Sequence, residues 1–176
     1  MEVSQEGSAM KVPSAARTRP GDLPRVLFAA TIVAILDISF AATYWVVYKG
    51  TTTLPRILQS IATGIQGRAA MQGGTASVLL GAAAHCAVAL GWTMIFWLAA
   101  RRWPAFRRVL GSRGGAFRVG MPYGVFVWLA MEFVVVPISH AKPAPVLSAW
   151  FAVSLVWHAF GVGLPMAVIL REPVSS

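Results

Sequence analysis

The hydrophobic positions of the chain fall into four long runs, separated by more polar segments. These runs cover residues 26–48, 76–100, 117–139 and 147–170, and each is nearly free of charged side chains. As a helix, a run of about 20 apolar residues crosses the roughly 30 Å hydrocarbon core of a bilayer. The pattern therefore predicts an all-α, polytopic membrane protein, with four transmembrane helices in one domain over residues 23–172.

A shorter segment with a helical period lies between the first two runs. Its apolar side chains recur at steps of three or four residues: Leu54, Ile57, Leu58, Ile61 and Ile65. Polar side chains fall mainly on the opposite face of such a helix. The pattern predicts an amphipathic helix over about residues 54–71 that lies in the membrane interface. A short re-entrant segment is the alternative, and its polar face would need protein or water around it.

Composition agrees with a membrane protein, and the charge distribution predicts its orientation. The chain is 57% hydrophobic and 12% charged, whereas soluble domains are roughly 45–50% apolar. The net charge of +9 would suit a nucleic-acid partner. However, eleven Lys and Arg residues lie in the two termini and the loop between the second and third runs, against four on the other side. This bias predicts no nucleic-acid partner, and it predicts that both termini and the loop between the second and third runs are cytoplasmic.

The two ends of the chain are predicted to lie outside the bundle. Residues 1–22 are polar and contain two prolines, which favours a disordered cytoplasmic tail, and residues 173–176 form a short C-terminal tail. The first apolar run exceeds the usual 7–15 residues of a signal-peptide core and contains Asp37, so a retained helix is expected. The single cysteine, Cys86, excludes a disulfide framework.

Each predicted transmembrane helix carries one ionisable side chain far from its ends: Asp37, His85, Glu132 and His158. Small residues flank each of them at helical spacing, which allows neighbouring helices to approach closely. At about 1.5 Å per residue, the four groups lie roughly 10–17 Å below the outer boundary. We therefore expect them to converge inside one bundle. One acid and one histidine in each half also suggest a 2+2 parallel repeat about an axis along the membrane normal.

Three chemistries suit these four groups, beside a purely structural role as interhelical hydrogen bonds. A carboxylate paired with an imidazole can exchange a proton near neutral pH or hold a cation. Two imidazoles with two carboxylates also suit a divalent metal such as Zn, Fe or Mn. Finally, haem b could bind between His85 and His158. The sequence has no P-loop, nucleophile elbow, dinucleotide fingerprint or HExxH motif, so no enzymatic activity is predicted.

Two stretches of the second half resemble a known group of proteins. MEFVVVPIS (131–139) and WHAFGVGLPMAVILRE (157–172) look like the third and fourth transmembrane helices of small YagU-like bacterial inner-membrane proteins. The similarity consists of a hydrophobic helix ending in a proline-containing turn, a proline-bearing outer loop and a histidine-containing helix closed by a basic residue. The resemblance implies a multi-pass inner-membrane protein with no established enzymatic activity and a link to acid tolerance.

Together, these patterns predict a small, non-enzymatic membrane protein that handles protons or a cation through the four buried groups. The alternatives are a haem- or metal-binding subunit of a membrane redox complex and a structural or assembly protein. The basic loop over residues 101–118 predicts contact with anionic lipid in the bilayer. A homo-oligomer or a partner in a membrane complex also stays open.

Overall fold

The computed structural model describes residues 22–142, 145 and 148–171, which form helices and connecting turns with no strand. The predicted tails over residues 1–22 and 173–176 therefore lie outside the described residues, apart from Asp22.

Four helices are long and apolar enough to cross a membrane, in agreement with the four predicted runs. The first consists of α1 (Asp22–Ala42) and the π-helical segment η1 (Thr43–Tyr48), and the second is α3 (Gly74–Arg102). The third combines α5 (Gly115–Ala130), the π-helical η3 (Met131–Val135) and α6 (Val136–Ile138). The fourth combines α7 (Ala149–Trp157), the π-helical η4 (His158–Gly163) and α8 (Leu164–Leu170).

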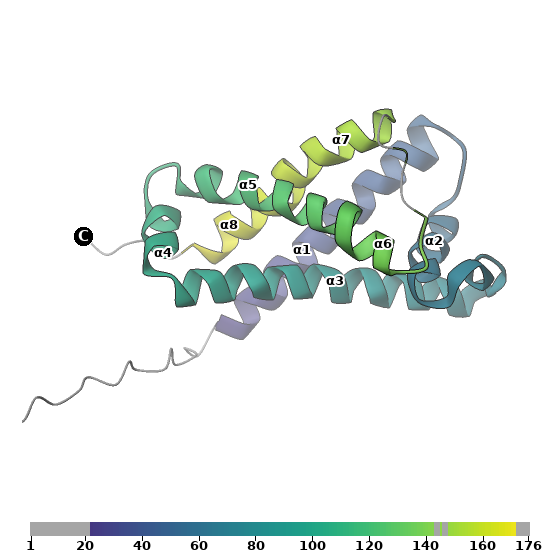
Figure 1. The fold of residues 1–176 in the computed structure, drawn as a ribbon, viewed down its shortest axis with the longest axis horizontal. Coiled ribbons are helices and arrows are strands. Elements are labelled where there is room, and N and C mark those ends of the chain that lie inside the picture. The colour runs from purple at the N-terminus through teal and green to yellow at the C-terminus, as the bar shows by residue number, and fades with distance from the viewer. Residues whose placement is uncertain (1–21, 143–144, 146–147, 172–176) are drawn as a thin grey trace, which may run out of the picture.

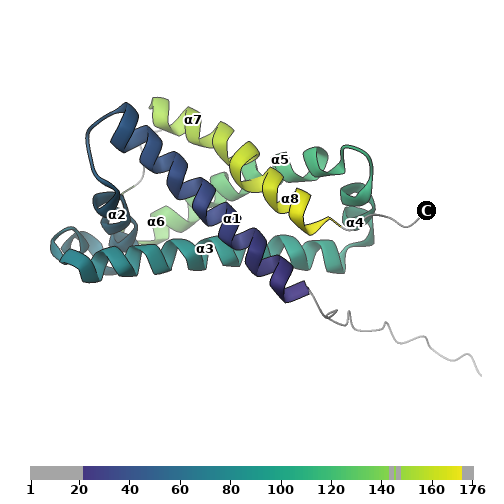
Figure 2. The ribbon, with the colours of Figure 1, turned by 180° about the vertical axis from the view of Figure 1, so that it is seen from behind.

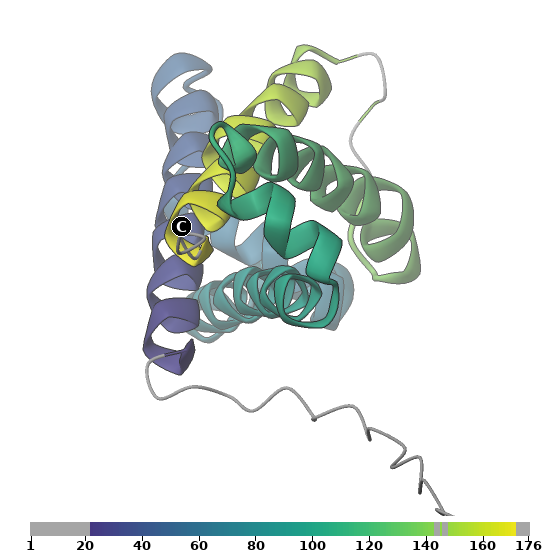
Figure 3. The ribbon, with the colours of Figure 1, turned by 90° about the vertical axis from the view of Figure 1, so that its left-hand side faces the viewer.

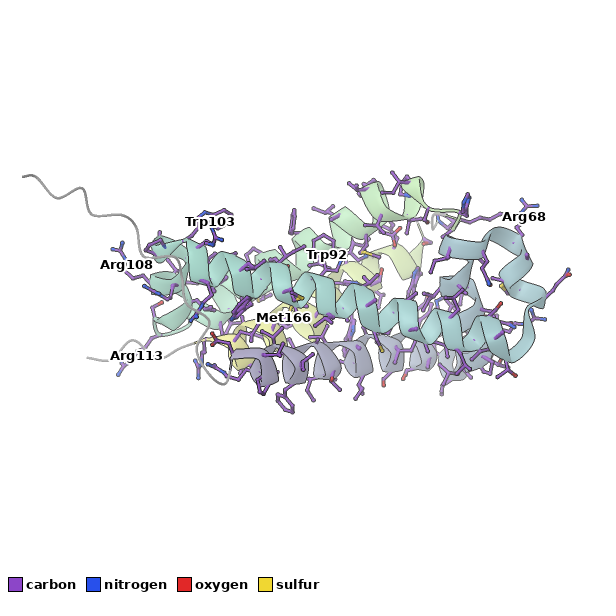
Figure 4. All side chains as sticks on the ribbon, turned by 90° about the horizontal axis from the view of Figure 1, so that it is seen from below. Arg68, Trp92, Trp103, Arg108, Arg113 and Met166 are labelled. Carbon is purple, nitrogen blue, oxygen red and sulfur yellow. The ribbon has the colours of Figure 1, made fainter. Side chains whose placement is uncertain are left out.

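Successive long helices run in opposite directions, so their termini gather at two ends of the molecule (Figures 1 and 2). We call one the α4 end, after the short helix α4 (Pro104–Gly111) that follows α3. The other is the α2 end, with α2 (Leu54–Gln66) and the 3₁₀ segment η2 (Gly67–Gln72). Seen from the α4 end, the four long helices surround a common centre (Figure 3). Trp103, Arg108 and Arg113 lie at the α4 end and Arg68 at the α2 end (Figure 4).

Polar contacts join the first helix to its neighbours at the α4 end. The Arg101 guanidinium lies 2.8 Å from the Asp22 carboxylate, which links α3 to the start of α1. Arg25 donates to the carbonyls of Ile169 (2.9 Å) and Arg171 (3.0 Å) at the end of the fourth helix. A carboxylate in the first helical turn is also favoured by the helix dipole. These interactions join the first described turn of α1 to α3 and to the end of the fourth helix.

The packed core occupies the half of the bundle toward the α4 end. It includes one strongly buried side chain from each long helix, each at most 3% exposed: Val33, Phe96, Val127 and Met166. The outer surface of the same helices is apolar as well, since Ile35, Leu79, Phe126 and Val156 are each more than half exposed. Apolar side chains on both the inner and outer faces are what a bundle in lipid requires.

Helix α2 packs against the outer part of α3. Gly81 permits this contact, because a Cβ atom there would overlap the Leu58 carbonyl oxygen. Ala62 is fully buried, and Gln59 donates to the Gly74 carbonyl (3.3 Å). The predicted single helix over residues 54–71 is divided at Gly67, whose φ of +63° ends the α-helix and starts η2.

Candidate functional site

Three of the four ionisable residues line one small cavity inside the bundle. Asp37 on α1, His85 on α3 and His158 at the start of η4 surround about 90 Å³, which we call the inner cavity. This volume accommodates several water molecules. Glu132 on η3 does not line the inner cavity, but its carboxylate is close enough to His158 for an electrostatic interaction. All four side chains are partly buried.

The orientation of His158 is determined by the helix turn before it. Its Nδ1 lies 2.8 Å from the Ser154 carbonyl, and because a carbonyl only accepts, Nδ1 carries the proton of this hydrogen bond. The hydroxyl of Ser154 in turn accepts from the Trp128 indole (3.0 Å), which holds α7 against α5. Nε2 of His158 is thereby directed to Asp37, with 3.9 Å between Nε2 and Oδ1.

His85 makes a different contact, from its own helix α3 to the backbone of α1. Its Nε2 lies 2.9 Å from the carbonyl of Ala34, one turn before Asp37 on α1. The same reasoning places the proton on Nε2 and leaves the lone pair on Nδ1 in the neutral ring. His85 therefore connects α3 to α1 at the level of the inner cavity.

The pairing of Asp37 with His158 has a direct consequence for protons. If the carboxylate is ionised and the imidazole is neutral, Oδ1 and Nε2 are two acceptors that face each other without a hydrogen between them. One proton, on either group, converts the pair into a donor and an acceptor. At 3.9 Å the atoms are beyond direct hydrogen-bond distance, so a water molecule or a small cation fits in contact with both.

A larger cavity leads from this pair toward the α2 end. It measures about 460 Å³, and we call it the outer cavity. Asp37, His85, Val88 and Met131 line both cavities, so the two adjoin at the ionisable groups. The far side of the outer cavity is formed by the connection after η1 and by α2 and η2, through Thr52, Arg56, Ser60 and Met71. Toward the α4 end, the core formed by Val33, Phe96, Val127 and Met166 closes the inner cavity.

Two of the ionisable residues lie in π-helical segments, which the sequence analysis did not predict. Glu132 is in η3 and His158 begins η4. Each segment precedes a proline, Pro137 or Pro165, which cannot donate to the carbonyl four residues earlier and so disturbs the α-helical ladder. Single π-turns are frequent at functional sites. One sequence signal could have indicated these π-turns. In both apolar runs, an ionisable residue stands a few positions before a proline.

The arrangement fits a proton pair better than the two cofactors considered from sequence. Within the described residues, no three His, Cys, Asp or Glu side chains are grouped so that they could hold a metal ion. The inner cavity of about 90 Å³ does not offer room for a porphyrin between His85 and His158.

No known protein family, curated protein or solved structure matches the chain. The fold and the site themselves define a bundle of four apolar helices, with a carboxylate–imidazole pair where the inner and outer cavities meet.

Proposed function

We propose that this chain is a small, non-enzymatic membrane protein that handles protons, or a small cation, through Asp37 and His158. His85 positions α1 beside the pair, and Glu132 adds negative charge near the imidazole. The observation that carries the proposal is the approach of two facing acceptors, Asp37 Oδ1 and His158 Nε2, to 3.9 Å in a cavity with room for water.

The cavities support a route with one open side. The inner cavity adjoins the outer cavity, which reaches α2, whereas the opposite direction is closed by buried apolar side chains. Such an arrangement gives the pair access from the α2 end while it is sealed from the α4 end. Release to the other side would require the core to rearrange, as in alternating access.

Charge supports the orientation of this route in a bacterial inner membrane. Among the described residues, eight basic side chains lie at the α4 end: Arg25, Arg101, Arg102, Arg107, Arg108, Arg113, Arg118 and Arg171. Four lie at the α2 end: Lys49, Arg56, Arg68 and Lys142. By the positive-inside rule, the α4 end is cytoplasmic and the outer cavity opens to the periplasmic side. The basic α4 end also suits contact with anionic lipid.

Proton and cation flux into liposomes tests the proposal. We expect Asp37→Asn to reduce flux at least about tenfold, because an amide hydrogen-bonds but does not ionise. Glu132→Gln should reduce it less, since Glu132 does not line the inner cavity. Thermal unfolding in detergent, measured in parallel, should change little for either variant.

Two results would overturn the proposal. One is wild-type flux no greater than that of empty liposomes. The other is equal flux in wild type and Asp37→Asn, which would leave Asp37 as a structural hydrogen-bonding group.

A further inference from the structure

The outer cavity has groups of opposite charge toward its two ends. Asp37 lies where the outer cavity meets the inner one, in the middle of the bundle. Arg56 lies on α2, at the far side. A proton route by itself does not need a cationic side chain or a volume of about 460 Å³. Small-molecule sites in proteins usually have volumes of about 300–1,000 Å³.

We propose that the outer cavity binds a small zwitterion with a primary ammonium group and an acidic group, such as an amino acid. The ammonium lies at Asp37 and the acid at Arg56. This inference deepens the proposed function and rests on it for the role of Asp37, because a bound ammonium would compete with, or be coupled to, the proton of the Asp37–His158 pair.

The inner part of the cavity presents hydrogen-bond acceptors. An ionised Asp37 only accepts, and it is 29% exposed, so its oxygens are accessible from the cavities. His85 donates through Nε2 to Ala34, which leaves Nδ1 as an acceptor on a ring that lines the cavity. A primary ammonium has three N–H donors and satisfies such a set, whereas a quaternary ammonium has none.

The outer part of the cavity presents the guanidinium of Arg56, whose position is fixed by hydrogen bonds. One terminal nitrogen of Arg56 donates to the Met71 carbonyl (2.7 Å) and approaches Gln59 Oε1 at 3.5 Å. These contacts fix the group beside the cavity while its other N–H groups retain the planar geometry that binds a carboxylate. A simple amine would be repelled by Arg56, and a simple acid by Asp37. The two charges together favour a molecule that carries both signs.

Much of the lining of the outer cavity is apolar and suits a short carbon chain. Trp45 and Trp150 line the cavity with their ring centroids 5.3 Å apart and their planes inclined by 49°. Ile57 and Ile61 from α2 also line it. Aromatic faces attract an ammonium group and pack against methylene groups.

Calorimetric titration of the purified protein in detergent tests the inference. The probes are ω-amino acids from glycine to 6-aminohexanoate, with the alkylamine and carboxylate of matching length as controls. We expect one chain length to bind at least about tenfold more tightly than either control, because only the ω-amino acid places an ammonium at Asp37 and a carboxylate at Arg56 in the same molecule. Absence of saturable binding for every ω-amino acid overturns the inference.

The affinities of two variants test which residue binds each end of the ligand. Arg56→Gln should reduce the affinity for the best ω-amino acid to about that of the matching amine, and Asp37→Asn to about that of the matching carboxylate. Arg68→Gln is the control, because Arg68 belongs to another cavity beside α2 and does not line this one. Unchanged affinity in both cavity variants, with unaltered thermal unfolding, contradicts the assignment.

The failure of this inference can be distinguished from that of the proposed function. Binding in detergent requires no flux, and proton flux can be measured without any amino acid. Flux that depends on Asp37 without ω-amino acid binding overturns only the zwitterion site. Binding that depends on Arg56 and Asp37 without flux overturns only the relay.

Discussion

At the scale of single residues, His85 and His158 have different tasks although both rings line the inner cavity. His158 directs Nε2 to Asp37, whereas His85 uses Nε2 to hold a carbonyl of α1. The difference arises from the neighbouring backbone: Ser154 orients one ring within its own helix, and Ala34 engages the other across helices.

The two histidines should therefore separate flux from stability. His158→Gln should reduce proton flux at least about tenfold with a small change in unfolding temperature, because it removes the imidazole that faces Asp37. His85→Leu should reduce the flux less than His158→Gln, because His85 acts by holding α1, and it should lower the stability by about 0.6–1.7 kcal/mol, as expected for an interhelical hydrogen bond in membranes. Liposome flux and thermal unfolding measure both effects, and the opposite ranking would contradict these assignments.

At the scale of helices, the position of His158 depends on close packing between α5 and η4. Gly120 and Gly124 are four residues apart on α5, a spacing that lets transmembrane helices approach closely. A Cβ atom at Gly124 would overlap the His158 carbonyl oxygen, and one at Gly163 would overlap the Gly120 carbonyl oxygen. These glycines set the distance from η4 to α5.

Gly124→Ala is expected to destabilise the protein by about 1–3 kcal/mol, since the added methyl group forces apart two packed backbones. It should also reduce proton flux by displacing His158 from Asp37. Gly91→Ala on α3 is the matched control, because a Cβ atom there meets nothing within 4 Å. Unfolding temperatures and liposome flux provide the comparison, and equal behaviour of the two variants would argue against tight α5–η4 packing.

The packing of α2 against the end of the third helix can be tested by a disulfide cross-link. A Cβ atom built on Gly64 lies 3.7 Å from Cβ of Ser139, next to the hydrogen bond from the His140 amide to the Gly64 carbonyl (3.2 Å). Disulfides typically join Cβ atoms about 3.5–4.5 Å apart. We expect Gly64→Cys with Ser139→Cys, in a Cys86→Ser background, to form a disulfide on mild oxidation. Mobility on non-reducing gels measures it, and absence of a disulfide would contradict the close approach of α2 to the end of the third helix.

At the scale of the whole molecule, the basic side chains are unevenly divided between the two ends, and this determines the expected orientation. A reporter fused after Ser176, or inserted at Gly114, should lie in the cytoplasm. Alkaline phosphatase in these positions should be inactive, and a fluorescent protein should be fluorescent. Phosphatase activity from either fusion would reverse the orientation and place the outer cavity on the cytoplasmic side.

Much of this architecture follows from local patterns in the chain. The four apolar helices and the amphipathic segment at residue 54 were predictable, because length and the spacing of apolar side chains are properties of each segment alone. The presence of one ionisable residue in each apolar run was likewise visible from sequence. The proposed parallel repeat stays a prediction.

The tertiary structure decided which ionisable groups meet and what each can do. Asp37, His85 and His158 share a cavity while Glu132 lies beside it, a distinction that depends on helix rotation and on the π-turns before Pro137 and Pro165. The protonated nitrogen of each imidazole is determined by the carbonyls of Ala34 and Ser154. Gly81 allows the α2 backbone to approach α3, and α2 forms the far side of the outer cavity. Such features depend on contacts between segments far apart in the chain, which no local pattern specifies.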